Sequence, residues 1–419
     1  MKKFKFWLVL SIFIASLLVF PLLVHNLIMD RPLHILILII VIAINILAII
    51  VLMISYKKLK SKMALLEDDE RINNLLIKKL PLDIDEVKIK EKIKGKICLI
   101  TGGGGTIGSE LSKQIASLKP ERLIILDIYE NNAYRIQQYL LREFTDLNLD
   151  IEIGSIRDHD KMDKLFKKYN PDIIFHAAAH KHVPLMENSP DEAIKNNIGG
   201  TLNMVELADK YRTEEFVLIS TDKAANPTSI MGATKLCSEM IAEDFARRGS
   251  STKFLTVRFG NVIGSSGSII PLFKEQILNG GPLTLTDPDV ERYFMSTSEA
   301  VMLVLQSTIY DEGTFILDMG TPVKIADLAE NMISLFGDRP NRDIKIKYIG
   351  LRPGEKLYEE YTSKEEELEP TEHDRIYKVR SNKKREDALL PKINQLIQSA
   401  QQNAPANELK EMLNEIINM

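Results

Sequence analysis

An acid and an amine stand side by side in this sequence, at Asp222 and Lys223. They follow the apolar run 216–219, which is typical of a buried parallel strand. Open α/β sheets bind their ligands at the carboxyl ends of such strands. The position therefore indicates a site in which one of the two groups gives a proton and the other takes one.

This pairing can work only with an unusual distribution of protons. Asp222 must begin protonated and Lys223 neutral if they are to act as acid and base. Burial disfavours the charged form of both groups, so it shifts both pKa values toward neutrality. We expect this shift at the site. The alternative is a structural ion pair at the end of a strand.

A helix is expected directly after this pair, over residues 229–245. Met231 and Lys235 are four residues apart in it, so they lie on one face of the helix. We predict that this face borders the site, although the thioether of Met231 can transfer no proton. The catalytic residues that we predict are Thr221, Asp222, Lys223, Met231 and Lys235.

A glycine-rich turn marks a second part of the site. The apolar run 96–100 leads into TGGGGTIG and then into helical spacing over 109–118. Three of the glycines permit a tight turn, close approach of a pyrophosphate and packing of helix on strand, with the phosphates at the helix N-terminus. The residues expected to hold a dinucleotide here are Gly102, Gly105, Thr106, Ile107 and Gly108.

Further cofactor contacts are expected at the ends of the next strands. Asp127 lies about 20 residues after the last glycine, where a carboxylate accepts from ribose hydroxyls and repels a 2′-phosphate. NAD is therefore favoured over NADP, unless Asp127 only caps a loop. Asp158 follows the third predicted strand, on the adenine side. Ala177 and Ala178 follow the fourth, where small side chains let a cofactor lie against the backbone.

Three histidines occur within seven residues, at His176, His180 and His182. Such a cluster suggests a zinc site, but no fourth ligand recurs at the spacing of metal ligands. We therefore predict that the protein binds no metal. His182 is instead expected on the substrate side of the site.

Two uncharged runs, 6–24 and 35–55, are each long enough to cross a hydrocarbon core as a helix. Lysines flank both outer ends, whereas the turn carries only Asp30 and Arg31. The positive-inside rule then puts both flanks in the cytoplasm. We predict a multi-pass membrane anchor in contact with lipid, with spans at about 6–28 and 34–55. A cleaved signal peptide is disfavoured because a second span follows and a cleavage site is missing.

The rest of the chain reads as an α/β protein with a Rossmann-like doubly wound parallel sheet. The formal net charge of −4 gives no sign of a nucleic-acid partner. Residues 57–94 fit either a solvated spacer or a docking helix. The domains that we predict are a transmembrane hairpin at 1–56, a juxtamembrane helix or linker at 57–94, an NAD-binding domain at 95–275, a smaller substrate-binding region at 276–362, and a polar tail with a terminal helix at 363–419.

Six motifs together resemble the extended short-chain dehydrogenase family: TGGGGTIG, HAAAHKHVP, STDKAANPTSIMGATK, VRFGNVIGSSGSIIPLF, RYFM and GLRPGEKLYEE. Within it, the chain resembles the membrane-bound nucleoside-diphosphate-sugar 4,6-dehydratases of bacterial glycan synthesis, the CapD, WbpM and PglF type. The likeness covers about residues 94–361. Most short-chain dehydrogenases have Tyr in the pattern Y-x-x-x-K, whereas this branch has Met, as at Met231.

The resemblance implies the dehydration of UDP-N-acetylglucosamine to a 4-keto-6-deoxy sugar for capsular polysaccharide, with a bound NAD that is reduced and reoxidised in each turnover. It also implies that Asp222 is the acid and Lys223 the base. We expect Thr221 to orient the C4 hydroxyl, and Lys235 to hold the nicotinamide ribose and relay a proton. We further expect a homo-oligomer.

Substrate contacts are expected from the later motifs. A guanidinium can bind phosphate oxygens in a bidentate way, which makes Arg292 and Arg352 candidates for the diphosphate. Glu355 would accept from a ribose or orient Arg352. The full set of expected substrate residues is His182, Arg258, Asn261, Arg292, Arg352 and Glu355.

Two other functions remain open from the sequence. A nucleotide-sugar 4-epimerase would share the fold and the cofactor, but it normally needs the Tyr that Met231 replaces. An inactive NAD-binding membrane scaffold would also lack that Tyr, but it has no need for an acid and a base at a strand end. Loss of water from a UDP-sugar distinguishes the dehydratase from both.

Overall fold

A computed structural model describes residues 39–40, 42–53, 56, 82–265, 267–381 and 388–419. The chain divides into two compact units, Met1–Asp69 and Glu70–Met419. In the first unit the described residues are helical. No helix within the described ranges is both long and apolar enough to span a membrane. The predicted span at 6–28 and residues 57–81 of the linker predicted at 57–94 lie outside the described residues, and the span at 34–55 is described only in part.

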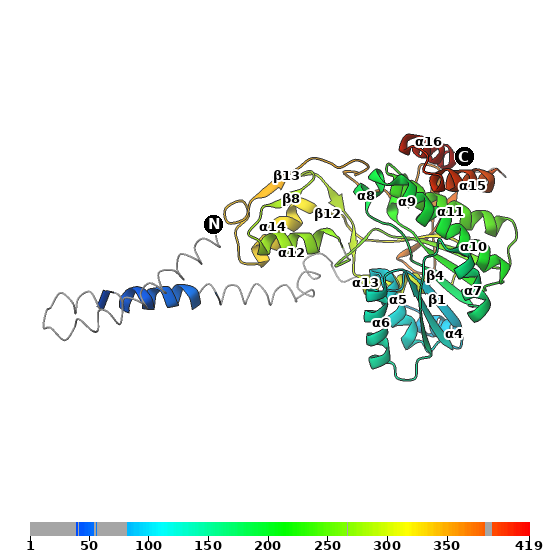
Figure 1. Cartoon of the computed structure of the whole chain (residues 1–419), viewed down its shortest axis with the longest axis horizontal. Coiled ribbons are helices and arrows are strands. Elements are labelled where there is room, and N and C mark those ends of the chain that lie inside the picture. Colours follow the sequence, from blue (N-terminus) through cyan, green and yellow to red (C-terminus); the bar gives the residue numbers. More distant parts are fainter. Residues whose placement is uncertain (1–38, 41, 54–55, 57–81, 266, 382–387) are drawn as a thin grey trace. The chain divides into compact units, whose positions relative to one another are not determined.

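A nine-stranded sheet forms the centre of the second unit (Figure 1), in the order β14-β15-β11-β6-β5-β4-β1-β2-β3. The strands from β3 to β11 pair in parallel, whereas β15 and β14 are antiparallel additions at one edge. The strands are β1 (Ile97–Thr101), β2 (Arg122–Asp127), β3 (Leu149–Ile153), β4 (Ile173–His176), β5 (Glu215–Ile219), β6 (Lys253–Arg258), β11 (Gly313–Leu317), β14 (Glu366–Pro370) and β15 (Ile376–Ser381).

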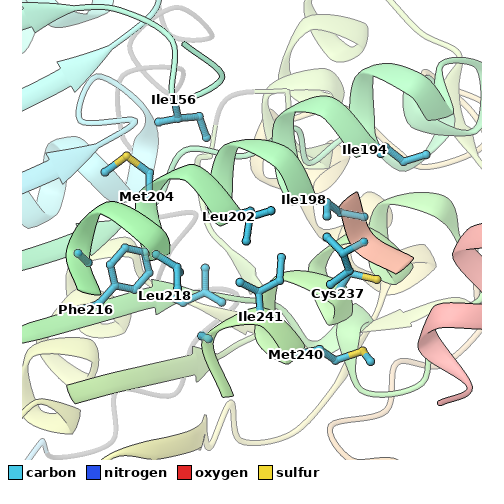
Figure 2. Packing of buried hydrophobic residues seen from close by; sticks show 14 of the residues in the cluster. Ile156, Ile194, Ile198, Leu202, Met204, Phe216, Leu218, Cys237, Met240 and Ile241 are labelled. Atoms are coloured by element: carbon cyan, nitrogen blue, oxygen red, sulfur yellow. The ribbon is translucent and has the colours of Figure 1, made fainter. Parts of the chain in front are cut away.

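Helices cover both faces of this sheet. Neighbouring residues of each strand point to opposite sides, so each strand places apolar side chains under the helices of both faces. Leu99 belongs to one apolar cluster, with α7, α10, α11, α15 and α16, and Figure 2 shows part of it. Cys98 and Ile100 belong to the other, with α4, α5, α6 and α13. The predicted doubly wound fold is confirmed. The helices are α4 (Glu86–Ile93), α5 (Thr106–Ser117), α6 (Glu130–Glu143), α7 (His159–Tyr169), α10 (Gly200–Lys210), α11 (Ile230–Arg247), α13 (Thr297–Ser307), α15 (Leu389–Gln401) and α16 (Ala406–Ile417).

Shorter elements complete the site end of the unit. The Ser229 side chain accepts from the Gly232 amide and caps α11. The helix itself therefore begins at Ile230, one residue after the expected start. Part of the predicted substrate-binding region returns to the large sheet as α13 and β11. The remaining elements are α8 (Val183–Asn188), α9 (Pro190–Ala193), the π-helix η1 (Ile194–Gly199), the 3₁₀ turn η2 (Asp222–Ala224), β7 (Asn261–Val262), α12 (Ile269–Leu278), β8 (Leu283–Leu285), β9 (Glu291–Arg292), β10 (Phe294–Met295), β12 (Val323–Lys324), α14 (Ile325–Leu335) and β13 (Ile346–Tyr348).

The tail after residue 362 is more than polar surface. Its β14 and β15 extend the sheet, and Ile376 is fully buried against β11. Helices α15 and α16 bury Ile393 and Leu413 in the same cluster as α11. The terminal helix that the sequence predicted is α16. Most of the acidic run at 365–369 lies in a strand because residues 366–369 pair with β15, a partner that local composition does not reveal.

Arg258, at the end of β6, is tied into the core by two carboxylates. Its Nε donates to both oxygens of Glu239 at 3.0 Å, and its Nη1 and Nη2 donate to Glu366 at 2.9 Å. The Arg258 and Glu239 side chains are each 3% exposed. Because this guanidinium is already surrounded by carboxylates, the expectation that Arg258 binds substrate is wrong.

We predict that this network is important for stability. Glu239→Ala should lower the free energy of unfolding by about 3–5 kcal/mol, because it leaves a buried guanidinium without one of its partners. Urea denaturation measures this change. The matched control is Glu369→Ala, which removes an exposed partner of Arg380 and should cost at most about 0.5 kcal/mol. Equal losses in both variants would contradict the prediction.

Candidate active site

The turn between β1 and α5 consists of glycines because its backbone comes too close to its neighbours for side chains. Gly102 has a φ of +66°, and a Cβ there would lie 2.9 Å from Ala178 Cα. A Cβ on Gly108 would lie 2.1 Å from the Gly102 carbonyl oxygen. Gly105 precedes α5 and brings no capping side chain. The positive end of the helix dipole therefore faces whatever lies in front of the turn.

A cavity of about 470 Å³ lies in front of this turn, and we call it the glycine-loop cavity. It brings together the β1–α5 turn, the ends of β4 and β5, and the first turns of α11. Most of the predicted site residues therefore share one space. Those that line it are Gly102, Gly105, Thr106, Ile107, Gly108, Ala177, His182, Thr221, Lys223, Met231, Lys235 and Asn261.

A second cavity of about 420 Å³, the Asp127 cavity, shares Gly102 and Gly105 with the first and is also lined by Ala178. Asp127 Oδ2 accepts from the Gly104 amide and Oδ1 accepts from the Tyr129 amide, both at 2.8 Å. A carboxylate oxygen can accept more than one hydrogen bond. Asp127 is therefore fixed in place and still able to accept from a hydroxyl group.

Asp158 does not line the Asp127 cavity. Its carboxylate accepts from the Lys161 amide at 3.0 Å and caps α7. The preceding residue, Arg157, lines the cavity instead and pairs with Glu192 at 2.7 Å. The carboxylate of Asp158 therefore starts a helix, and the structure gives its expected adenine contact no support.

A third cavity of about 250 Å³, the Arg352 cavity, meets the glycine-loop cavity at Lys223 and Asn261, which line both. It is also lined by Arg292, Arg352, Glu355 and Glu359. A fourth cavity, around Thr286, shares Asn261, Arg292, Arg352 and Glu355 with it. Lys223 thus lies where the space in front of the glycine turn joins the space lined by the predicted substrate residues.

The Asp222 carboxylate is held by its two neighbours. Its Oδ1 accepts from Thr221 Oγ1 and from Lys223 Nζ, each at 2.9 Å. Its Oδ2 is buried and makes no hydrogen bond. Asp222 is 1% exposed and lines neither the glycine-loop cavity nor the Arg352 cavity. Its neighbours do reach the cavities: Thr221 lines the glycine-loop cavity, and Lys223 lines both.

The expectation that the pKa of Lys223 moves toward neutrality is wrong for this state, because its surroundings favour the cation. Burial alone lowers the pKa of Lys223, but the charges of Asp222 and Glu359 outweigh burial and raise it. Glu359 Oε1 lies 3.2 Å from Lys223 Nζ. The sequence argument considered one carboxylate beside this amine, whereas the fold supplies two.

Met231 and Lys235 lie on the face of α11 that borders the glycine-loop cavity, as expected. Lys235 Nζ donates to the Ile219 carbonyl at 2.7 Å. Burial lowers the pKa of Lys235 to about 8, although the charge of Glu239 opposes this. An amine with a pKa of about 8 can both donate and accept a proton near neutral pH.

Arg292 and Arg352 differ in how free they are. Arg292 donates to the carbonyls of Glu291, Lys356 and Leu357 at 2.7, 2.8 and 3.1 Å. Its remaining donors face two carboxylates, Glu355 and Glu359, each at 3.4 Å. The Arg352 guanidinium is exposed and has no acceptor among the described residues. Arg292 therefore braces the loop, and Arg352 is the arginine available to an anion.

Glu355 supports this loop as well. Its Oε1 accepts from Thr286 Oγ1 at 3.0 Å and its Oε2 accepts from the Arg352 amide at 3.2 Å. It therefore positions the backbone of Arg352, not its guanidinium. His182 packs against Gly267, where a Cβ would lie 2.6 Å from His182 Cε1. Burial, and then the charge of Lys181, lower the pKa of His182.

The glycine turn fits a dinucleotide. The two cavities around it together pass from Asp127 to Lys235 and meet at Gly102 and Gly105 of the turn, which line both. An elongated ligand with phosphates in its middle would place them at the N-terminus of α5. Glu359 is the residue that sequence reasoning missed. It lies in the GEKLYEE motif, four residues after Glu355, but nothing in the motif indicates which glutamate faces the lysine.

The chain matches a known protein family and several known proteins. The profile of a family described as "Polysaccharide biosynthesis protein" matches residues 98–381. The probable polysaccharide biosynthesis protein EpsC of Bacillus subtilis is 50% identical over 301 residues, which cover 71% of this chain and 50% of that protein. The chain thus spans about half the length of the first curated relatives that it matches.

Two further relatives, of which the chain covers 79% and 83%, carry more specific names. A UDP-N-acetylglucosamine 4,6-dehydratase (inverting) of Campylobacter jejuni is 33% identical over 290 residues, which cover 68% of this chain and 83% of that protein. A UDP-glucose 4-epimerase of Rickettsia canadensis is 35% identical over 278 residues, which cover 65% of this chain and 79% of that protein. Identity alone therefore does not choose between the two reactions.

Solved structures agree on the fold. The X-ray structure of Pen from Bacillus thuringiensis matches with a TM-score of 0.62 and 36% identity, covering 70% of this chain and 89% of that one. The dTDP-glucose 4,6-dehydratase DesIV from Streptomyces venezuelae, solved with NAD bound, matches with a TM-score of 0.54 and 23% identity, covering 62% and 86%. The second likeness concerns the fold alone.

We predict that the two arginines of the Arg352 cavity respond differently to truncation. Arg352→Ala should weaken the binding of UDP, used as a diphosphate probe, by about tenfold or more, because charge-assisted hydrogen bonds to phosphate are worth about 1.5–3 kcal/mol. It should leave the thermal midpoint unchanged. Arg292→Ala should lower the midpoint as well, because it leaves carbonyls and carboxylates of the loop without a donor. Calorimetry and thermal unfolding measure both effects. Unchanged UDP affinity in Arg352→Ala would refute the assignment.

Proposed function

The chain belongs to the polysaccharide biosynthesis protein family, within the extended short-chain dehydrogenases, and on that premise we propose that it is a nucleotide-sugar 4,6-dehydratase. Its substrate is UDP-N-acetylglucosamine, and its product is the 4-keto-6-deoxy sugar used for a polysaccharide. The observation that carries the proposal is the position of Lys223, beside Asp222 and at the junction of the glycine-loop and Arg352 cavities. An acid and a base at one point are what removal of water requires.

NAD is the cofactor, and when bound it would supply the temporary oxidation at sugar C4. Gly102, Gly105 and Gly108 would hold its pyrophosphate at the start of α5. Asp127 would accept from the adenosine ribose in the Asp127 cavity, and a negative charge at that point favours NAD over NADP. Ala177 and Ala178 leave room against the backbone.

Lys223 takes the proton from C5 of the oxidised sugar. The electrons of that C–H bond form the bond between C5 and C6 as the C6–O bond breaks, and Asp222 gives the departing oxygen the proton that completes a water molecule. Because Lys223 starts as a cation, its amine must first pass a proton to Asp222. The 2.9 Å hydrogen bond from Nζ to Oδ1 provides a direct path for it. The transfer makes both groups ready without any proton from solvent.

The C4 hydroxyl needs a partner other than Met231. Thr221 lines the glycine-loop cavity and donates to Asp222, so its hydroxyl can accept from a sugar hydroxyl there. Lys235 lies in the same cavity with its pKa lowered to about 8. We assign to it the ribose contact and the relay of the C4 hydroxyl proton. Asn261 and Arg352 bind the sugar and the diphosphate.

The setting of the enzyme is part of the proposal. The uncharged runs 6–24 and 35–55, with lysines at both outer ends, support a membrane anchor with the catalytic unit in the cytoplasm. A role in capsule or other surface polysaccharide, and a homo-oligomeric state, are proposed on the family alone.

The product of the wild-type protein tests the reaction. Incubated with several UDP-sugars and analysed by mass spectrometry, the protein should remove water from a UDP-hexosamine. In deuterated water C5 should gain deuterium, while hydrogen carried on C4 should reappear at C6. A product of unchanged mass would support the 4-epimerase instead. No change with any UDP-sugar, despite bound NAD, would support the scaffold.

Substitution of the proton-transfer pair tests the residue roles. Asp222→Asn and Lys223→Met should each reduce water loss by about 100-fold or more, the usual contribution of acid–base groups. Both variants should still bind NAD, because neither residue lies at the glycine turn or at Asp127. Activity and cofactor affinity are measured on the same preparations. Substantial dehydration by the double variant would refute the assignment of acid and base.

A further inference from the structure

An ion pair at the Asp127 cavity has no part in the proposed reaction. Arg157 Nη1 donates to Glu192 Oε2 at 2.7 Å, and both residues line this cavity. Their side chains are 37% and 40% exposed. Side chains that line a cavity and also reach solvent lie where that cavity opens. The ion pair is therefore at the mouth of the Asp127 cavity.

The two partners follow strands that are not neighbours in the sheet. Arg157 follows β3, and Glu192, in α9, follows β4. In the order β4-β1-β2-β3, two strands lie between them, so β3 and β4 are about 14 Å apart at the usual strand spacing. The glycine turn after β1 and Asp127 at the end of β2 line the same cavity. The ion pair therefore joins two loops that start on opposite sides of the cavity.

Other contacts hold each partner in place. Glu192 Oε1 accepts from Lys195 Nζ at 2.9 Å, which leaves Oε2 for Arg157. The loop that carries Arg157 is fixed to α10, because Asn203 Nδ2 donates to the Ile156 carbonyl at 3.0 Å and the Ile156 side chain is buried. The ion pair itself is partly exposed, so it can open and close by movement of its side chains alone.

We propose that this ion pair is a clasp that slows the passage of NAD into and out of the Asp127 cavity. The inference rests on the proposed function in one respect, which is that NAD is the resident cofactor. A cofactor that is reduced and reoxidised in each turnover has no need to leave, so slow exchange does not slow the reaction. The clasp joins protein to protein and makes no contact with the cofactor. It therefore affects the rates of binding and release but not the affinity.

Three variants test the clasp. Arg157→Met and Glu192→Gln each remove the ion pair and leave the other charges partnered, because Lys195 also pairs with Asp191 at 2.7 Å. Both should raise the association and dissociation rates together by about two- to fivefold, the contribution of an exposed ion pair. The dissociation constant should stay unchanged. The double variant should match the single variants, because all three lack the same interaction.

The rates are measured on the full chain by stopped-flow fluorescence, with NADH as the probe and excess NAD to start its release. The matched control is the ion pair of Arg122 and Asp150, at 2.6 Å with side chains 35% and 29% exposed, which lines neither the glycine-loop cavity nor the Asp127 cavity. Arg122→Met and Asp150→Asn should leave both rates unchanged. In about 1 M salt, where the Debye length is about 3 Å, the wild-type rates should approach those of the Arg157 and Glu192 variants.

Wild-type rates in both Arg157→Met and Glu192→Gln would overturn the clasp. Faster release in Arg157→Met alone would also overturn it, since Arg157 would then bind the cofactor directly. No sugar substrate enters these measurements, so they are separate from the dehydration. If NADH binds but no UDP-sugar loses water, the proposed reaction fails and the rates still judge the clasp. If the wild type binds no NADH, the clasp is refuted together with the cofactor.

Discussion

Parallel hydrogen bonding of β1 with both of its neighbours determines where this protein can do chemistry. Because β2 and β4 both pair in parallel with β1, the chain crosses away from β1 in two directions at that point. The carboxyl ends of the parallel strands all face one edge. The glycine turn after β1, Asp127 at the end of β2 and Lys223 after β5 meet there, although up to 121 positions separate them along the chain (223 − 102).

At that edge the protein keeps an ammonium group between two carboxylates. Burial works against each of the charges, and mutual attraction and hydrogen bonds compensate for it. Such a cluster joins η2 to the loop that carries Glu359. In the dehydration that we propose, one proton must cross the hydrogen bond from Lys223 to Asp222 before Lys223 can act as a base.

Local sequence predicted what depends on local spacing. The strands, α11 and the glycine turn follow from apolar runs and from residues that adopt special backbone angles. The partners of charged side chains do not follow in this way. Arg258 was expected at the substrate because it follows a strand, but it binds Glu239, 19 residues away, and Glu366, 108 residues away. Asp158 carried a recognisable sign of its true role, since a carboxylate before a helical pattern is a common N-cap.

The pairing of Arg258 with Glu366 also bears on how the polypeptide matures during synthesis. Ribosomes add about 5–20 residues per second, and domains fold as they emerge. β6 and its arginine leave the ribosome well before Glu366 and β15 exist. The growing chain therefore holds an incomplete sheet, with an open edge at β11 and a half-neutralised guanidinium, until β14 and β15 are made. A chain released before that point would expose the edge to other nascent chains or to chaperones.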